Sequence, residues 1–130
     1  MVNLGKYSVK ELSETGVEFY LTDIRTGLEI EEPKFVVYGM DSEIVTLARR
    51  KYSELVAVKH MKEWKKDEYL LDFITACVKS WDEFQYNEDL VKNQDKVALR
   101  KFFVESPQFK DQISEFVTER ANFLAVSDSL

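Results

Sequence analysis

The 130-residue chain has few of the residues from which catalytic and metal sites are built. It contains a single cysteine, Cys77, and a single histidine, His60, so no intrachain disulfide is possible and a structural zinc site cannot be assembled. The four glycines are scattered at turn positions and form no phosphate-binding loop. Neither a nucleophile with its base nor the ligand spacing of a calcium loop is present. The sequence therefore predicts a protein that is not an enzyme and holds no cofactor or metal ion.

Long apolar runs and an excess of basic residues are missing as well. The longest uncharged apolar run, residues 35–40, is far shorter than the roughly 18 residues of a membrane-spanning helix, and residues 1–5 do not resemble a signal peptide. The net charge is -6, which argues against nucleic-acid binding because phosphates are neutralised by clustered lysine and arginine in excess. We therefore expect a cytoplasmic protein whose partners are neither membranes nor nucleic acids.

Apolar and aromatic residues are plentiful, at 45% and 13% of the chain, which is enough to build a hydrophobic core. A length of 130 residues suits one domain. Residues 1–40 are rich in β-formers, residues 41–125 have helical patterns, and residues 126–130 are expected to fray. We predict an α+β fold, mainly α-helical, with a small N-terminal antiparallel β-hairpin or meander packed on about four helices.

The β-rich part contains two strand candidates separated by turn residues. Residues 17–22 and 35–38 are β-prone, and residues 23–27 have the composition of a turn. Pro33 lacks a backbone N–H donor, so we expect it at the start of its strand or at a sheet edge. With so few strands, this sheet must pack against the helices to be stable.

Two helices are expected between residues 41 and 81. Asp41 and Ser42 supply N-cap oxygens for the first helix. We expect Lys65-Lys66-Asp67 to end this helix and Asp67 to cap the second. The apolar spacing assigns core positions in the first helix to Ile44, Leu47, Ala48, Leu55 and Val58. In the second helix it assigns them to Leu70, Leu71, Ile74, Cys77, Val78 and Trp81.

Two further helices are expected after a polar connection at residues 82–92. A third helix runs from about Asn93, its N-cap, to Val104. A fourth begins at Ser106-Pro107, because serine caps helices and proline at the first position loses only an unpaired amide. The inward residues are Val97, Phe102 and Phe103 in the third helix, and Phe109, Ile113, Phe116, Val117, Phe123 and Leu124 in the fourth.

Residues 49–66 form a basic segment within the acidic chain, with seven Lys and Arg residues against two Glu. This segment is interpreted either as a solvated helix face or as a docking surface for an acidic partner or another copy. The candidate residues for self-association are Arg49, Arg50, Lys59, Lys62, Lys65 and Lys66.

Aromatic residues near the end of the chain have two interpretations. Residues 81–86 carry three aromatics, which suit either a core or a protein-binding hot spot. Trp81 continues a helical stripe and is assigned to the core, whereas Phe84 and Tyr86 lie in an acidic segment and remain open between the two interpretations. Phe123 and Leu124 extend the fourth helix's stripe, but they also lie near a chain end that a client protein could reach.

The order of several motifs resembles the tail assembly chaperones of long-tailed bacteriophages. The motifs are Gly39-Met40-Asp41-Ser42 at a helix start, Trp81 before an acidic turn, Pro107 at a helix start and a closing Ala121-Asn122-Phe123-Leu124. The resemblance covers about residues 17–125. The chain departs from the pattern at residues 86–92, where related proteins often have a glycine-containing turn and a proline-led helix start.

The resemblance implies a non-enzymatic chaperone that binds the tape-measure and tail-tube proteins in the host cytoplasm and is absent from the finished particle. Several copies along one tape-measure chain would make self-association plausible. The candidate partner-binding residues are Phe84, Tyr86, Phe116, Arg120, Asn122, Phe123 and Leu124. One alternative is a structural tail or neck protein that is retained in the virion. Another is a small regulatory enzyme or ligand-binding domain with a polar pocket around His60.

Overall fold

The computed structural model describes residues 1–124 and has the predicted α+β class. Residues 125–130, which include the expected frayed end, lie outside the described part. In chain order the elements are η1 (Leu4–Tyr7), α1 (Lys10–Thr15), β1 (Val17–Thr22), β2 (Glu29–Val37), α2 (Glu43–Val56), α3 (Glu63–Ala76), β3 (Val78–Trp81), β4 (Phe84–Tyr86), β5 (Asp89–Val91), α4 (Lys96–Glu105), α5 (Pro107–Thr118) and η2 (Arg120–Phe123).

The predicted N-terminal hairpin is present as β1 and β2, which pair antiparallel from Val17 opposite Val37. Its turn closes through the Gly27 amide, which donates to the Asp23 carbonyl at 2.8 Å, and Gly27 has a φ of 73° that glycine adopts without strain. The sheet has the order β1-β2-β3, and its third strand comes from far along the chain, after α3. The sheet therefore ties the N-terminal part to the helices.

Pro33 lies inside β2, so its predicted place at a strand start or sheet edge is wrong in the literal sense. The physical reason for the expectation still applies. Strand β3 pairs with β2 only from Phe35 onward, and the register of β1 shifts between Tyr20 and Thr22. Proline therefore stands where the ladder is least regular and a missing N–H donor costs least.

Helix α2 begins where the sequence predicts, because the Ser42 hydroxyl accepts the Val45 amide at 3.1 Å. The predicted break at residues 65–67 is wrong. Helix α2 ends at Val56, residues 57–62 form the turn, and α3 already begins at Glu63, so Asp67 lies within α3 and caps nothing.

The predicted core stripe of α2 is also largely wrong. Val45 is fully buried, whereas Ile44 and Leu47 are 43% and 52% exposed and Val58 lies exposed in the turn. The reason is that α2 packs mainly against a single helix, α3, so that only a narrow line of its side chains is covered. Apolar spacing alone gave no sign that one side of this stripe stays uncovered.

The second predicted helix ends earlier than expected. Helix α3 stops at Ala76, and Val78 and Trp81 belong to strand β3, although both are buried as predicted. At this change of structure the Lys96 ammonium donates to the carbonyls of Thr75 and Val78. Lys96 of α4, which is distant in sequence, thus bonds one carbonyl near the end of α3 and one carbonyl of β3.

The predicted connection at residues 82–92 is instead the β4–β5 hairpin, with Asn87 at a φ of 54° in its turn. Asp95, not Asn93, caps α4 by accepting the Ala98 amide at 3.1 Å. Asn93 accepts the Trp81 amide at 3.0 Å and so holds the strand. Val97, expected to face inward, is 81% exposed.

The last helix, α5, starts at Pro107 as predicted, and its residues Ile113 and Val117 are buried. They pack in one core with Phe102 and Phe103 of α4 and with sheet residues such as Phe35. The Ser106 hydroxyl makes no cap bond to the helix and donates to the Tyr86 hydroxyl at 2.6 Å. This contact fixes the β4–β5 hairpin to the junction of α4 and α5.

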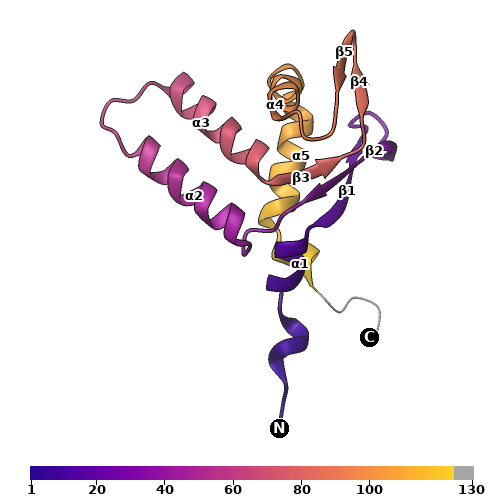
Figure 1. The fold of residues 1–130 in the computed structure, drawn as a ribbon, viewed down its shortest axis with the longest axis vertical. Helices are drawn as coiled ribbons and strands as arrows, with labels where there is room; N and C mark the ends of the chain where they lie inside the picture. The colour runs from indigo at the N-terminus through magenta and orange to yellow at the C-terminus, as the bar shows by residue number, and fades with distance from the viewer. Residues whose placement is uncertain (125–130) are drawn as a thin grey trace.

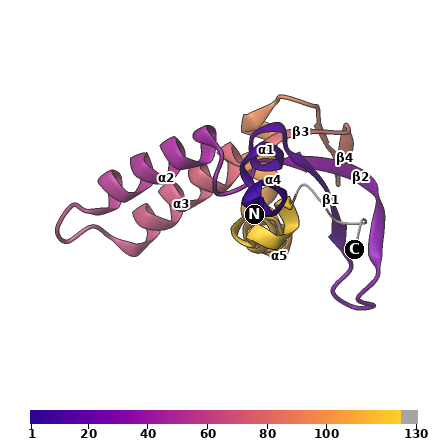
Figure 2. The same cartoon turned by 90° about the horizontal axis from the view of Figure 1, so that it is seen from below.

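The α2–α3 pair projects from this core to one side, while the sheet and the β4–β5 hairpin lie on the other side (Figures 1 and 2). We call this projecting pair, residues 43–76, the arm. Within residues 1–124, no helix combines the length and the apolar character needed to cross a membrane.

Candidate interaction surfaces

The C-terminal motif that carries the resemblance, and Arg120 directly before it, have partners within the fold. The Arg120 guanidinium donates to both carboxylate oxygens of Asp41, at 2.8 and 3.0 Å, and the Asn122 amide donates to the Phe116 carbonyl at 3.0 Å. Phe123 is 1% exposed and its ring lies 5.7 Å from that of Phe116. The motif thus fastens the end of α5 to the start of the arm.

The pairing of Arg120 with Asp41 has an electrostatic signature. The hydrogen bond from Arg120 is the main cause that lowers the pKa of the Asp41 carboxyl below its usual value of 3.8. Asp41 also precedes the Ser42 cap, so one short segment links the α2 N-terminus to the chain end. The Asp-Ser of the predicted helix start and Arg120, which directly precedes the closing motif, therefore form one structural unit.

Phe84, Tyr86 and Phe116 are half-buried and are packed against the core. The Phe84 and Tyr86 rings lie 4.9 and 5.0 Å from Phe102, in edge-on contacts. Phe116 packs against Phe19 at 4.7 Å. These contacts account for the aromatic character of the three positions, and partner binding through their exposed parts stays a prediction.

The seven candidate partner-binding residues therefore do not form one surface. Phe84 and Tyr86 lie on the β4–β5 hairpin, and the others lie at the end of α5, in η2 and directly after η2. The assignment of Phe123 to an open surface is wrong, because its ring is sealed in the core. Leu124, next to it, is 36% exposed.

The arm has an apolar hollow that the sequence analysis did not identify. We call it the arm groove, a hollow of about 220 Å³ lined by Ala48, Lys51, Tyr52, Leu55, Tyr69, Asp72, Phe73 and Ala76. Two of the lining residues, Tyr52 of α2 and Phe73 of α3, have ring centroids 6.0 Å apart. The exposed Ile44 and Leu47 lie on the same helix, so α2 presents more apolar surface than α3 covers.

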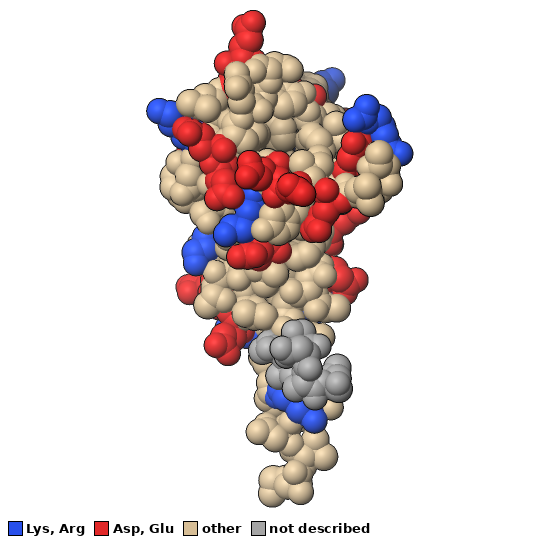
Figure 3. Space-filling model, turned by 90° about the vertical axis from the view of Figure 1, so that its right-hand side faces the viewer, with Lys and Arg blue, Asp and Glu red and all other residues tan. Residues whose placement is uncertain are grey.

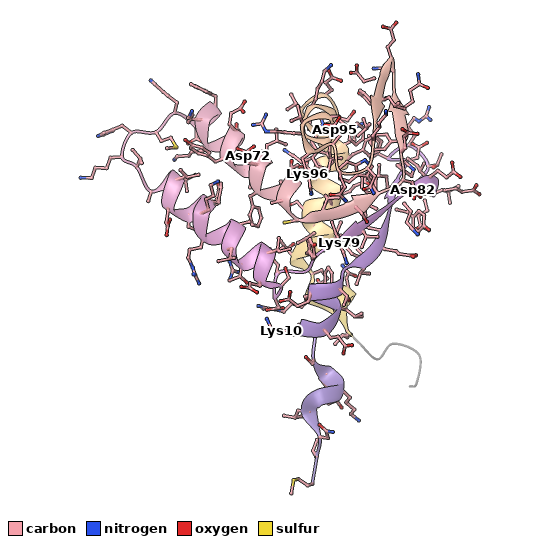
Figure 4. All side chains as sticks on the ribbon, in the orientation of Figure 1. Lys10, Asp72, Lys79, Asp82, Asp95 and Lys96 are labelled. Carbon is pink, nitrogen blue, oxygen red and sulfur yellow. The ribbon has the colours of Figure 1, made fainter. Side chains whose placement is uncertain are left out.

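The single carboxylate in the lining of the arm groove is already paired. Asp72 accepts from the Arg100 guanidinium of α4 at 2.6 Å, and Arg100 also bonds Glu68. Figure 4 shows Asp72 on the side of α3 that faces α4. Lys51 is the other charged residue of this lining, so the groove combines apolar walls with a positive edge.

The basic residues of the arm are placed at its outer end and outer surface. The arm tip, residues 58–66, holds Lys59, Lys62, Lys65 and Lys66, while Arg49 and Arg50 lie exposed on α2. Trp64, to which the sequence patterns assigned no role, is 64% exposed at this tip, and the Lys65 ammonium lies 5.7 Å from the centre of its ring. His60 is exposed in the same turn, with a φ of 63°.

The opposite side of the molecule is acidic. Figure 3, which views the side away from the arm, shows a band of Asp and Glu side chains across the middle of the molecule, with Lys and Arg side chains beside it. Exposed carboxylates on this side come from β2 and the turn after β3; they are Glu29, Glu31, Glu32, Asp82 and Glu83. The charge asymmetry of the sequence is thus an asymmetry between two ends of the fold.

The buried ionisable groups have structural surroundings. Burial raises the pKa of the Cys77 thiol to about 12, which opposes formation of a reactive thiolate. Burial lowers the pKa of Lys96, whose ammonium is held by backbone carbonyls. Among residues 1–124, no group of three or more His, Cys, Asp or Glu side chains is placed to hold a metal ion.

No protein-family model, curated protein or solved structure matches this chain.

Proposed function

We propose that this protein is a tail assembly chaperone of a long-tailed bacteriophage that holds apolar helices of the tape-measure protein in the arm groove. The observation that carries the proposal is the uncovered apolar surface of the projecting α2–α3 arm. The order of motifs from Gly39 to Leu124 supports the same assignment by resemblance. The protein acts in the host cytoplasm without enzymatic chemistry, and it engages the tail-tube protein before it leaves the assembling tail.

The chemistry of the arm groove suits an amphipathic helix as client. Tyr52, Leu55 and Phe73 supply apolar and aromatic contacts, and Lys51 at the rim complements acidic residues that flank an apolar stripe. A tape-measure protein is long, helical and rich in such stripes, which aggregate when exposed. Covering them with a protein of net charge -6 keeps the complex soluble.

Co-expression with the tape-measure protein of the same phage tests this proposal. Leu47→Glu places a negative charge on α2 one helical turn before Lys51 of the groove lining, and it is expected to weaken client binding at least about tenfold, or about 1.4 kcal/mol. Leu47 is 52% exposed, so the fold itself should change by only about 0.5 kcal/mol. The soluble fraction of the tape-measure protein is measured after centrifugation, and the melting temperature of the variant is measured alone.

Val97→Glu is the matched control, because Val97 is an exposed apolar residue on α4, outside the arm. It should leave client solubility at the wild-type level. Equal solubility with Leu47→Glu and wild type would contradict the assignment of the groove.

Mass spectrometry of purified virions separates the chaperone from a structural tail or neck protein. The chaperone is expected to be absent from mature particles and present in lysates during assembly. Its presence in particles at a stoichiometric level would refute the chaperone proposal.

A further inference from the structure

The arm tip carries a combination of residues that is typical of an interface anchor. Trp64 is 64% exposed, and large aromatic side chains next to cations are enriched at the centres of protein interfaces. Within residues 1–124, Lys59 and Lys62 make no ion pair. The tip therefore offers both apolar area and unneutralised positive charge, and it does so at the end of the arm that is farthest from the core (Figure 1).

The acidic side of the molecule has the complementary character. In the part of the chain that the structure describes, Glu29, Glu31, Glu32 and Glu83 are exposed and make no ion pair, whereas the neighbouring Glu18 pairs with Lys34 at 3.5 Å. We call these four residues the acidic face. Three of them lie on the part of β2 that β3 does not reach.

These two surfaces cannot meet within one molecule, because the arm and the sheet extend in opposite directions (Figures 1 and 2). We propose that the arm tip of one copy docks on the acidic face of a second copy. Two unlike surfaces form a heterologous contact, which repeats from copy to copy instead of closing into a two-fold dimer. The copies therefore associate head to tail.

The arm tip shares no residue with the lining of the arm groove, although the Lys65 ammonium lies 5.4 Å from the centre of the Tyr69 ring in that lining. Association is therefore measured in the absence of client. The opposite charges of the arm tip and the acidic face accelerate the encounter of two copies, and their attraction is screened over about 8 Å at physiological salt. The association constant should therefore fall more than tenfold between low salt and molar salt. The Trp64 ring supplies the apolar part of the contact. Trp64→Ser should weaken association at every salt concentration without lowering the melting temperature.

Sedimentation velocity of the isolated full chain tests the proposal with two capped variants. The tip variant carries Lys62→Gln, Trp64→Ser and Lys65→Gln, and the face variant carries Glu31→Gln and Glu32→Gln. Each loses one of the two surfaces and keeps the other. The control Lys6→Gln with Lys92→Gln removes two exposed lysines outside the tip.

Wild type and the control are expected to form species that grow with concentration, while each capped variant alone stays monomeric. An equal mixture of the two variants should give a dimer and nothing larger, because one intact tip and one intact face remain. A monomeric wild type at all concentrations and salts overturns the proposal, as does a tip variant that assembles like wild type or a mixture that stays monomeric. Loss of client solubility with the arm-groove variant bears only on the proposed function.

Discussion

Replacing Phe123 by alanine tests whether the closing motif is a scaffold element or a client-binding surface. The Phe123 ring is 1% exposed, lies 5.7 Å from Phe116, and sits where any Cβ on Gly39 would come within 3.0 Å of it. Removing a buried phenylalanine loses its transfer free energy and leaves a cavity, so we expect a loss of about 3–5 kcal/mol. That is a large part of the roughly 5–15 kcal/mol that stabilises a typical domain.

The assay is thermal or urea unfolding of the purified variant. A fall in melting temperature of roughly 10–20 °C is expected for a chain of this size. Leu124→Ala is the control, because Leu124 is adjacent in sequence but 36% exposed, and it should cost less than about 1 kcal/mol. If Phe123→Ala melted like Leu124→Ala while client solubility fell, Phe123 would be a binding residue and the structural reasoning would be refuted.

Two further predictions concern the junction that this motif closes. Gly39→Ala should lower the free energy of unfolding in urea by about 1–3 kcal/mol, because the new Cβ would lie 2.8 Å from the Ser13 Cβ. Ser13→Ala should leave the free energy of unfolding nearly unchanged, since the buried Ser13 hydroxyl has no hydrogen-bond partner in residues 1–124. A Gly39→Ala variant as stable as wild type would contradict this packing. The lowered pKa of Asp41 means that its ionised form stabilises the fold above pH 3.8 and that this contribution is lost as the pH falls through the folded value. Asp41→Asn should therefore have a lower melting temperature than wild type at pH 6, and this difference should shrink below pH 3.8. Asp67→Asn should show no such difference. A difference between Asp41→Asn and wild type that stays constant with pH would exclude the ion pair as its source.

Local signals predicted the parts of the fold that depend on neighbouring residues. The Ser42 cap, the turn at Gly27 and the helix start at Pro107 each follow from the chemistry of one or two side chains, and all three are present. The burial of Trp81 was also predicted, although its helix was not. These features need no knowledge of distant contacts.

Errors arose where distant residues decide the structure. Val78 and Trp81 become a strand because β2 offers an edge to pair with, and Lys96 satisfies the carbonyls where α3 ends. Periodicity cannot show either partner. In the same way, Asn93 is a residue type that often caps helices, but its side chain accepts a hydrogen bond from the Trp81 amide. Asp95 caps α4 instead.

The candidate surfaces were predicted only in part. The basic residues of the arm were identified from charge, and the structure places them on a projecting hairpin opposite an acidic side. Trp64 and the arm groove were missed, because apolar residues at helical spacing are ordinarily assigned to a core. What the sequence does not contain is the information that α2 has a neighbour, α3, on one side alone.

The motif that carries the resemblance and the surfaces that are free to bind a partner lie in different parts of the molecule. Arg120, Asn122 and Phe123 are held by particular partners, and such packing tolerates few substitutions. The arm groove is lined by apolar residues such as Leu55 and Phe73, and many sequences could supply such a lining. The recognisable order of residues therefore marks the scaffold, whereas the surface that we propose for the client has no fixed pattern. It follows that Leu47→Glu should weaken client binding at least about tenfold in a folded protein, whereas Phe123→Ala should lose client binding only to the extent that the fold is lost.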